Sequence, residues 1–188
     1  MRRGITIKDI LILCVIGVVI AFIVNGVDIQ SVDDYYRSRF DVISEESETV
    51  FLSICCSVVH DNLNSLDSHL KDEKYIPADG VMLPLTEYVL HPKETVFDIM
   101  ERAARLNGIQ IVHRGGSLSV YNSVYMQGIN HLFEYSCGPL SGWMYSINGA
   151  FPSYGCSAYE LRDGDVIEWR YTCDLGRDIG AGIGGWQI

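Results

Sequence analysis

The sequence predicts an α+β domain in which one main helix lies on a mostly antiparallel sheet, preceded by an N-terminal transmembrane helix. Three observations support this prediction: an apolar stretch behind a basic N-terminus, one segment with helical periodicity, and several short segments with alternating apolar residues. The chain has 188 residues, which leaves one modest core once a membrane segment is set aside. A single globular domain is therefore expected.

The N-terminal segment has the composition of a membrane anchor. Residues 10–24 carry no charged or strongly polar side chain, and the wider stretch 5–27 approaches the ~20 residues that span a bilayer core. Arg2 and Arg3 precede it and acidic residues follow it, so the positive-inside rule places the N-terminus in the cytoplasm. A cleaved signal peptide is the rival interpretation, but the absence of a small-x-small cleavage site favours an uncleaved anchor.

Changes in composition divide the rest of the chain. We expect a single-pass protein of the cell membrane whose larger part is extracellular. The four expected segments are a membrane anchor at 1–27, an acidic stalk at 28–48, a folded domain at 49–178 and a glycine-rich tail at 179–188.

Local patterns predict the first elements of the folded domain. Apolar residues alternate over Val50–Val59, as one buried face of a strand requires, and Thr86–Leu90 is a second candidate strand. Helical spacing of apolar residues over Val96–Leu106 predicts the main helix. Thr95 and Asp98 form a capping box at its start, and Asn107-Gly108 provides a stop.

The second half of the domain has the pattern of short strands. Candidate strands follow the helix at Ile109–Val112, Leu118–Tyr121 and Val124–Met126. Asn148-Gly149 predicts a tight hairpin between Trp143–Ile147 and a return arm at Phe151–Tyr154, and alternation over Val166–Cys173 predicts a last strand. Two strands, one helix and several further strands are the layout of a β-grasp-like domain.

Cysteines are numerous for a single small domain. Export would place them in a compartment where disulfides persist. Cys55 faces away from the buried side of its strand and is the expected unpaired thiol, which leaves three connectivities open for the others. The disulfide candidates are Cys56, Cys137, Cys156 and Cys173.

The composition and motifs of the sequence argue against several classes of function. A formal net charge of −10 repels phosphate backbones, so nucleic acid is not an expected partner. No nucleophile elbow, zinc-protease motif, P-loop or dinucleotide fingerprint is present, and the five histidines are scattered. We therefore expect neither an enzyme nor a metal site.

Aromatic residues concentrate around the predicted hairpin and suggest a contact surface. Such side chains combine a large apolar area with a polar tip, although part of the set is expected to face the core. Asn148 has a second interpretation, because an Asn-Gly turn needs it for backbone geometry alone. The candidate ligand-binding residues are Trp143, Tyr145, Asn148, Phe151 and Tyr154.

Three ordered motifs identify a family resemblance. Thr95–Asp98 reads T-V-F-D, Gly142–Gly149 reads G-W-M-Y-S-I-N-G, and Asp163–Trp169 reads D-G-D-V-I-E-W. Over roughly Val50 to Asp178 the chain resembles the DUF4430 family, also called the transcobalamin-like C-terminal domain. The resemblance implies a small β-grasp-related module, often exported and surface-attached, that in vitamin carriers covers one side of cobalamin. It implies no catalytic residue, and we expect no helical barrel like that of those carriers within these 188 residues.

Two functions follow from these expectations. The first is a membrane-tethered extracytoplasmic module that binds a small molecule such as cobalamin or a related corrinoid. The alternative is a protein–protein or adhesion module at the cell surface, with no small ligand. A concave pocket beside Trp143 would favour the first, and a flat exposed aromatic patch the second.

Overall fold

The computed structural model describes residues 7–8, 11–12, 14–16, 42–115 and 123–182. Among these residues, no helix has both the length and the apolar character needed to cross a membrane. Most of the predicted anchor and stalk, and one candidate strand before Ser123, lie outside the described residues. The anchor and the stalk therefore stay predictions.

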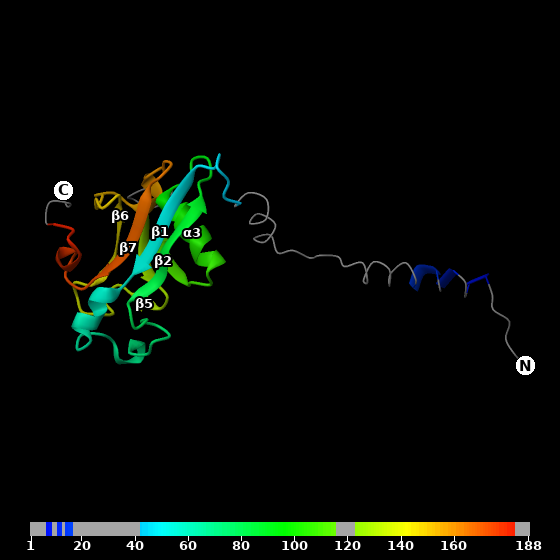
Figure 1. Cartoon of the computed structure of the whole chain (residues 1–188). Coiled ribbons are helices and arrows are strands. Elements are labelled where there is room, and N and C mark those ends of the chain that lie inside the picture. Colours follow the sequence, from blue (N-terminus) through cyan, green and yellow to red (C-terminus); the bar gives the residue numbers. More distant parts are fainter. Residues whose placement is uncertain (1–6, 9–10, 13, 17–41, 116–122, 183–188) are drawn as a thin grey trace, which may run out of the picture. The chain divides into compact units, whose positions relative to one another are not determined.

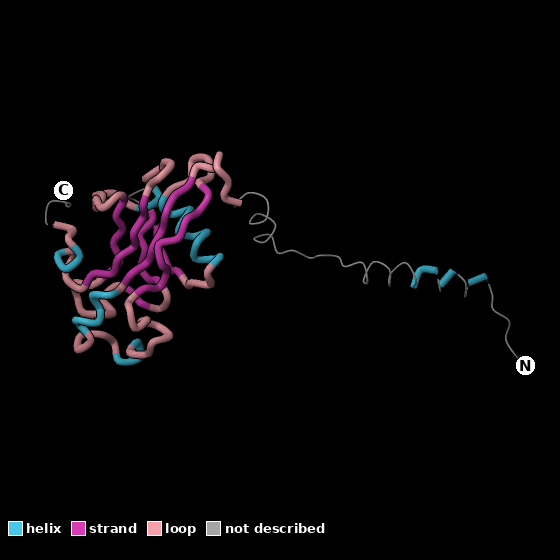
Figure 2. The backbone as a smooth tube through the Cα atoms, in the orientation of Figure 1, coloured by secondary structure: helices cyan, strands magenta, loops and turns pink. Residues whose placement is uncertain are grey.

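Residues 40–188 form a compact unit with mixed α+β structure. Figure 1 shows its strands coloured along the sequence, with β1 between β2 and β7, and Figure 2 shows the helices and loops around them. One sheet has four strands in the order β2-β1-β7-β6, and a second has three in the order β3-β4-β5. The elements are β1 (Thr49–Cys55), β2 (Val81–Val89), α3 (Val96–Leu106), β3 (Ile111–Gly115), β4 (Val124–Ile129), β5 (Leu132–Phe133), β6 (Gly142–Ile147) and β7 (Val166–Thr172), with short 3₁₀ helices at Ser57–Asn62, Ser68–Leu70, Cys156–Ala158 and Arg177–Ile179.

The larger sheet is built around a parallel pair of strands that are far apart in the sequence. β1 pairs in parallel with β7, with Leu52 opposite Ile167, whereas β2 and β6 join the outer sides antiparallel. The predicted alternation is confirmed within β1, because Val50, Leu52 and Ile54 are all fully buried. The predicted continuation of the strand to Val59 is wrong, because β1 ends at Cys55 and a 3₁₀ helix begins at Ser57. Four of the five strand pairings in the two sheets are antiparallel, as expected.

Helix α3 has the predicted bounds and the predicted cap. The Thr95 hydroxyl accepts a hydrogen bond from the Asp98 amide, and the Asp98 carboxylate accepts one from the Thr95 amide. Both bonds satisfy amides that have no partner inside the helix. One face of the helix is apolar and buried, and it consists of Val96, Ile99, Met100, Ala103 and Ala104.

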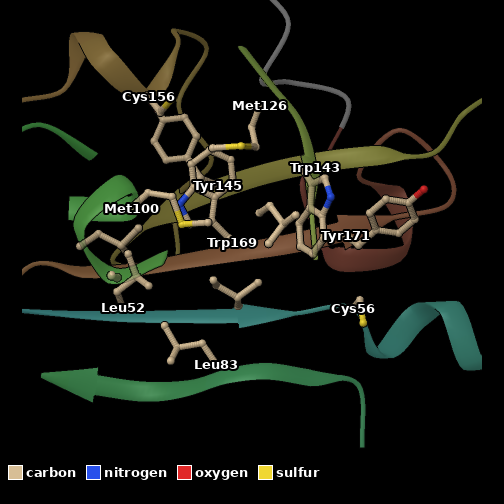
Figure 3. Packing of buried hydrophobic residues seen from close by; sticks show 14 of the residues in the cluster. Leu52, Cys56, Leu83, Met100, Met126, Trp143, Tyr145, Cys156, Trp169 and Tyr171 are labelled. Atoms are coloured by element: carbon tan, nitrogen blue, oxygen red, sulfur yellow. The ribbon is translucent and has the colours of Figure 1, made fainter. Parts of the chain in front are cut away.

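The buried core is contained within the compact unit. It brings together side chains of β1, α3, β6 and β7, of which Leu52, Met100, Tyr145 and Trp169 are examples (Figure 3). All buried members of this core lie between residues 50 and 171. The fragment 40–188 therefore carries its own complete core and is expected to fold by itself.

Strand β2 begins five residues earlier than the sequence predicts. It starts at Val81 rather than Thr86 and therefore includes Pro84. β2 is the outermost strand of its sheet, where the missing N–H of a proline is tolerated. The pairing with β1 is irregular at this point, between Leu52 and Ile54.

The predicted return arm of the hairpin is wrong. After Asn148-Gly149 a single bridge joins Ile147 to Ala150, and residues 151–154 form no strand. The partner of β6 is instead β7. Pro152 has no N–H to donate to a ladder, and the chain turns away from the sheet here.

Candidate ligand-binding cavity

The segment that leaves the sheet after β6 forms one wall of a cavity of about 1150 Å³. Binding sites for drug-sized ligands usually measure about 300–1,000 Å³, so this cavity is slightly larger than that range. Residues of strands β3, β4, β6 and β7 and residues 180–182 also line the cavity. The cavity is therefore assembled from segments that are distant in the sequence.

Two of the predicted contact residues are mainly part of the core. Trp143 is 6% exposed, donates its indole N–H to the Leu132 carbonyl over 2.8 Å and packs edge-on against Tyr171. Tyr145 is 8% exposed and lies at a tilt over Trp169. Both also line the cavity, so their buried rings form a rigid wall.

The hydroxyl of Tyr145 connects this wall to the irregular segment. It donates to the Tyr154 carbonyl over 2.8 Å, and burial raises the pKa of Tyr145 above its ordinary value. The hydroxyl therefore stays protonated and keeps the bond. Tyr154 is 48% exposed and its ring stacks on that of Tyr159. Phe151 and Tyr154 line the cavity from this side.

Asn148 has an architectural role in the structure. Its φ of 51° places it in the left-handed region that the tight turn requires. Its side-chain amide donates to the Asp165 carboxylate and its side-chain oxygen accepts from the Val166 amide. Asn148 is not among the described residues that line the cavity, although the neighbouring Gly149 is.

Several lining residues were not identified from the sequence. Arg114 and Met126 are separated from the hairpin by at least sixteen positions, and Gly180 and Ala181 lie in the predicted glycine-rich tail. Ile179 and Ala181 are nevertheless buried, which holds this part of the chain against the domain. The lining residues missed include Arg114, Met126, Cys156, Trp169, Gly180 and Ala181.

The cavity is apolar with one charge. Among the described residues that line it, only Arg114 is formally charged, and carboxylates are absent. Within the same described ranges, no group of His, Cys, Asp or Glu side chains is arranged to hold a metal ion. The arrangement is suited to the binding of an apolar body by aromatic and sulfur-containing side chains.

The structure corrects the predicted disulfides, because all six cysteines are free thiols. The Cys156 thiol donates to the Val124 carbonyl beside the cavity, whereas the Cys137 thiol donates to the Asn62 carbonyl elsewhere in the core. Burial is the main cause that raises the pKa of Cys56 and Cys156 to about 12. Both thiols therefore act as small apolar core groups.

We expect Cys56 and Cys156 to react with maleimide at pH 8 far more slowly in the folded fragment 40–188 than in urea. Their thiols ordinarily have a pKa of 9.0, so below pH 9 both the folded and the unfolded states are protonated. Between about pH 9 and 12 the unfolded thiols ionise first, so stability falls over that window. Urea unfolding at pH 8 and pH 10.5 measures this fall.

The variant Cys56→Val provides the control for this pH dependence. It removes one buried ionisable group and should make the loss of stability between the two pH values smaller. Mass spectrometry of the labelled protein identifies which thiols react. Equal labelling of Cys56 and Cys156 in folded and urea-unfolded protein at pH 8 would contradict their burial.

Fold and cavity together define a small α+β domain with a concave apolar site. Residues 93–173 match the model of the family described as Domain of unknown function (DUF4430), so the resemblance is confirmed for this segment. The matched segment runs from just before α3 to just after β7 and contains most of the cavity lining. Strands β1 and β2 lie outside it.

Similarity to other proteins is limited. No curated protein matches the sequence. Among solved structures, the chain is similar to haptocorrin in a crystal structure described as a complex with Cbi, with 15% sequence identity and a TM-score of 0.46. The match covers 71% of this chain but only 27% of that one. A TM-score below 0.5 does not establish a shared fold.

Proposed function

We propose that this protein is a binding module, not an enzyme, whose folded domain holds a small molecule in the cavity beside Trp143. The cavity is the main observation that supports this proposal, because a concave apolar site with a few polar groups is the usual form of a ligand site. Its buried aromatic wall is held by the Trp143–Leu132 and Tyr145–Tyr154 hydrogen bonds. A preformed site of this kind loses little entropy on binding.

The domain is further proposed to be β-grasp-like and to be presented outside the cell by an N-terminal anchor. The central parallel pair β1–β7, the antiparallel outer strands and the single α3 support the first statement. The basic N-terminus and the apolar residues 10–24 support the second. Cell fractionation tests the anchor, and recovery of the intact chain in the cytosol would contradict it.

A corrinoid is the first ligand to test. The family resemblance implies a domain that covers one face of cobalamin, and the cavity is large enough to accept part of a large cofactor. We expect fragment 40–188 to give a saturable heat on titration with cobalamin or cobinamide. The absence of heat at high concentrations of both would exclude the corrinoid.

Blocking the cavity tests the location of binding. Ser153 is an exposed residue that lines the cavity, and Ser153→Trp adds a large ring at this position. We expect affinity for any cavity ligand to fall at least tenfold, which corresponds to about 1.4 kcal/mol. The matched control is Ser68→Trp, an exposed position that does not line the cavity. Equal effects of both variants in calorimetry would contradict binding in the cavity.

One observation favours the alternative of a protein contact. Tyr135, Leu140 and Leu175 expose 64%, 40% and 52% of their surfaces. Backbone hydrogen bonds join the loops that carry them, from Leu175 to Leu140 and from Tyr135 to Ser141. These side chains offer an exposed apolar surface to another surface protein. Normal ligand binding by Tyr135→Ser with loss of a surface partner would support this second function.

A further inference from the structure

Arg114 has a defined position at the edge of the cavity. It lies on β3 directly opposite Tyr125 of β4, and its guanidinium carbon is 5.5 Å from the centre of the Tyr125 ring. Arginine stacks well on aromatic faces because its planar cation is weakly hydrated. The strand register therefore determines where this positive charge lies.

The Tyr125 ring is itself held in place. Its hydroxyl donates to a carboxylate oxygen of Glu134 over 2.7 Å, and the other oxygen of that carboxylate accepts from the Gln127 side chain. Glu134 thus uses both oxygens on neighbouring side chains and is not among the described residues that line the cavity. The negative charge lies at the hydroxyl end of Tyr125, whereas Arg114 lies over its ring face.

Arg114 places a positive charge beside the cavity of an acidic protein. The chain as a whole has a net charge of −10, yet the described lining of the cavity contains this one cation and no carboxylate. The ion pairs of Lys74, Arg102 and Arg177, which lie among the described residues, do not include Arg114. A guanidinium next to an apolar cavity can pair with an anionic group on a bound molecule.

We propose that the ligand of this cavity is an amphiphile, with an apolar ring body against the aromatic wall and an anionic group bound by Arg114. This inference rests on the proposed function and specifies the chemical class of the ligand. The wall formed by Trp143 and Tyr145 contacts the apolar body, and Phe151 lines the cavity from the irregular segment. The guanidinium above Tyr125 donates charge-assisted hydrogen bonds to a carboxylate, sulfonate or phosphate oxygen.

Two probes that share one ring system separate the charge from the apolar body. The anionic dye 8-anilinonaphthalene-1-sulfonate and the neutral N-phenyl-1-naphthylamine have the same aromatic rings, but only the first carries a sulfonate. Both gain fluorescence in an apolar site. We expect both to bind fragment 40–188 and both to be weakened at least tenfold by Ser153→Trp.

The variant Arg114→Gln removes the cation and keeps a shorter, polar and uncharged side chain. We expect it to weaken the sulfonate dye about tenfold, as loss of a charge-assisted hydrogen bond predicts, and to change the neutral dye less than twofold. Arg114→Lys keeps the charge and should retain most of the affinity for the sulfonate. Circular dichroism and urea unfolding verify that each variant is folded.

The outcomes distinguish this inference from the proposed function. Equal effects of Arg114→Gln on both dyes, with Ser153→Trp still blocking both, would overturn the role of Arg114 and leave the cavity as a binding site. Failure of both dyes to bind, or binding that Ser153→Trp does not weaken, would overturn the inference together with the cavity. A selective loss of the sulfonate dye supports the inference.

Discussion

Replacing Arg102 with methionine is expected to destabilise the domain by about 3–5 kcal/mol, because it leaves the buried carboxylate of Glu94 without its cation. The two side chains form a two-bond pair, with the Arg102 Nε and Nη2 atoms each 2.9 Å from a Glu94 oxygen. Their side chains are only 13% and 5% exposed. Arg102 also donates to the Val89 carbonyl, so the pair joins α3 to the end of β2. Urea unfolding of fragment 40–188 measures the loss.

Two variants control this experiment. Arg105→Met changes an exposed arginine of the same helix and should cost less than about 1 kcal/mol. The double variant Glu94→Met with Arg102→Met removes both charges and should recover most of the stability, since well-packed apolar residues often replace buried ion pairs without loss. Equal losses of unfolding free energy for Arg102→Met and Arg105→Met would show that the buried ion pair contributes no more to stability than an exposed arginine.

Replacing Leu52 with alanine is expected to cost about 2–5 kcal/mol through lost burial and the cavity left behind. Leu52 is fully buried in β1, where its backbone lies between Thr86 of β2 and Ile167 of β7. Its neighbours belong to an ordered sheet and to α3, so the site can collapse only in part. Calorimetric or urea unfolding of the same fragment measures the effect.

Leu85→Ala is the matched control for this substitution. Leu85 lies on the neighbouring β2 and is 59% exposed, so its truncation removes little buried surface. We expect a change within about 0.5 kcal/mol. A similar loss for Leu52→Ala and Leu85→Ala would mean that β1 is not at the centre of the core.

The elements that sequence patterns predicted well are those that depend on near neighbours. Helix α3 was predicted with its bounds and cap because its apolar spacing and the Thr95–Asp98 pair act within one or two turns. The buried faces of β1 and β7 follow from alternation alone. Periodicity cannot show that these two strands, more than a hundred residues apart, pair in parallel.

The candidate site was predicted in part. The clustering of aromatic residues in the sequence correctly predicted four residues that line the cavity, namely Trp143, Tyr145, Phe151 and Tyr154. The hairpin that was expected to present them is absent, because β6 pairs with β7 and residues 151–154 leave the sheet. A two-residue turn signal does not determine which strand completes the pairing.

By itself the sequence determined the α+β class, the capped helix, the buried faces of two strands and the resemblance of residues 93–173 to a known family. Only the tertiary structure decided that the cysteines are free, that Asn148 serves the turn, and that Arg114 lies over Tyr125 beside the cavity. The physical reason is how far apart in the sequence the contacting residues lie. Helix caps and strand faces arise from contacts within a few residues, whereas a cavity and its charge arise from strands that pair across the whole chain.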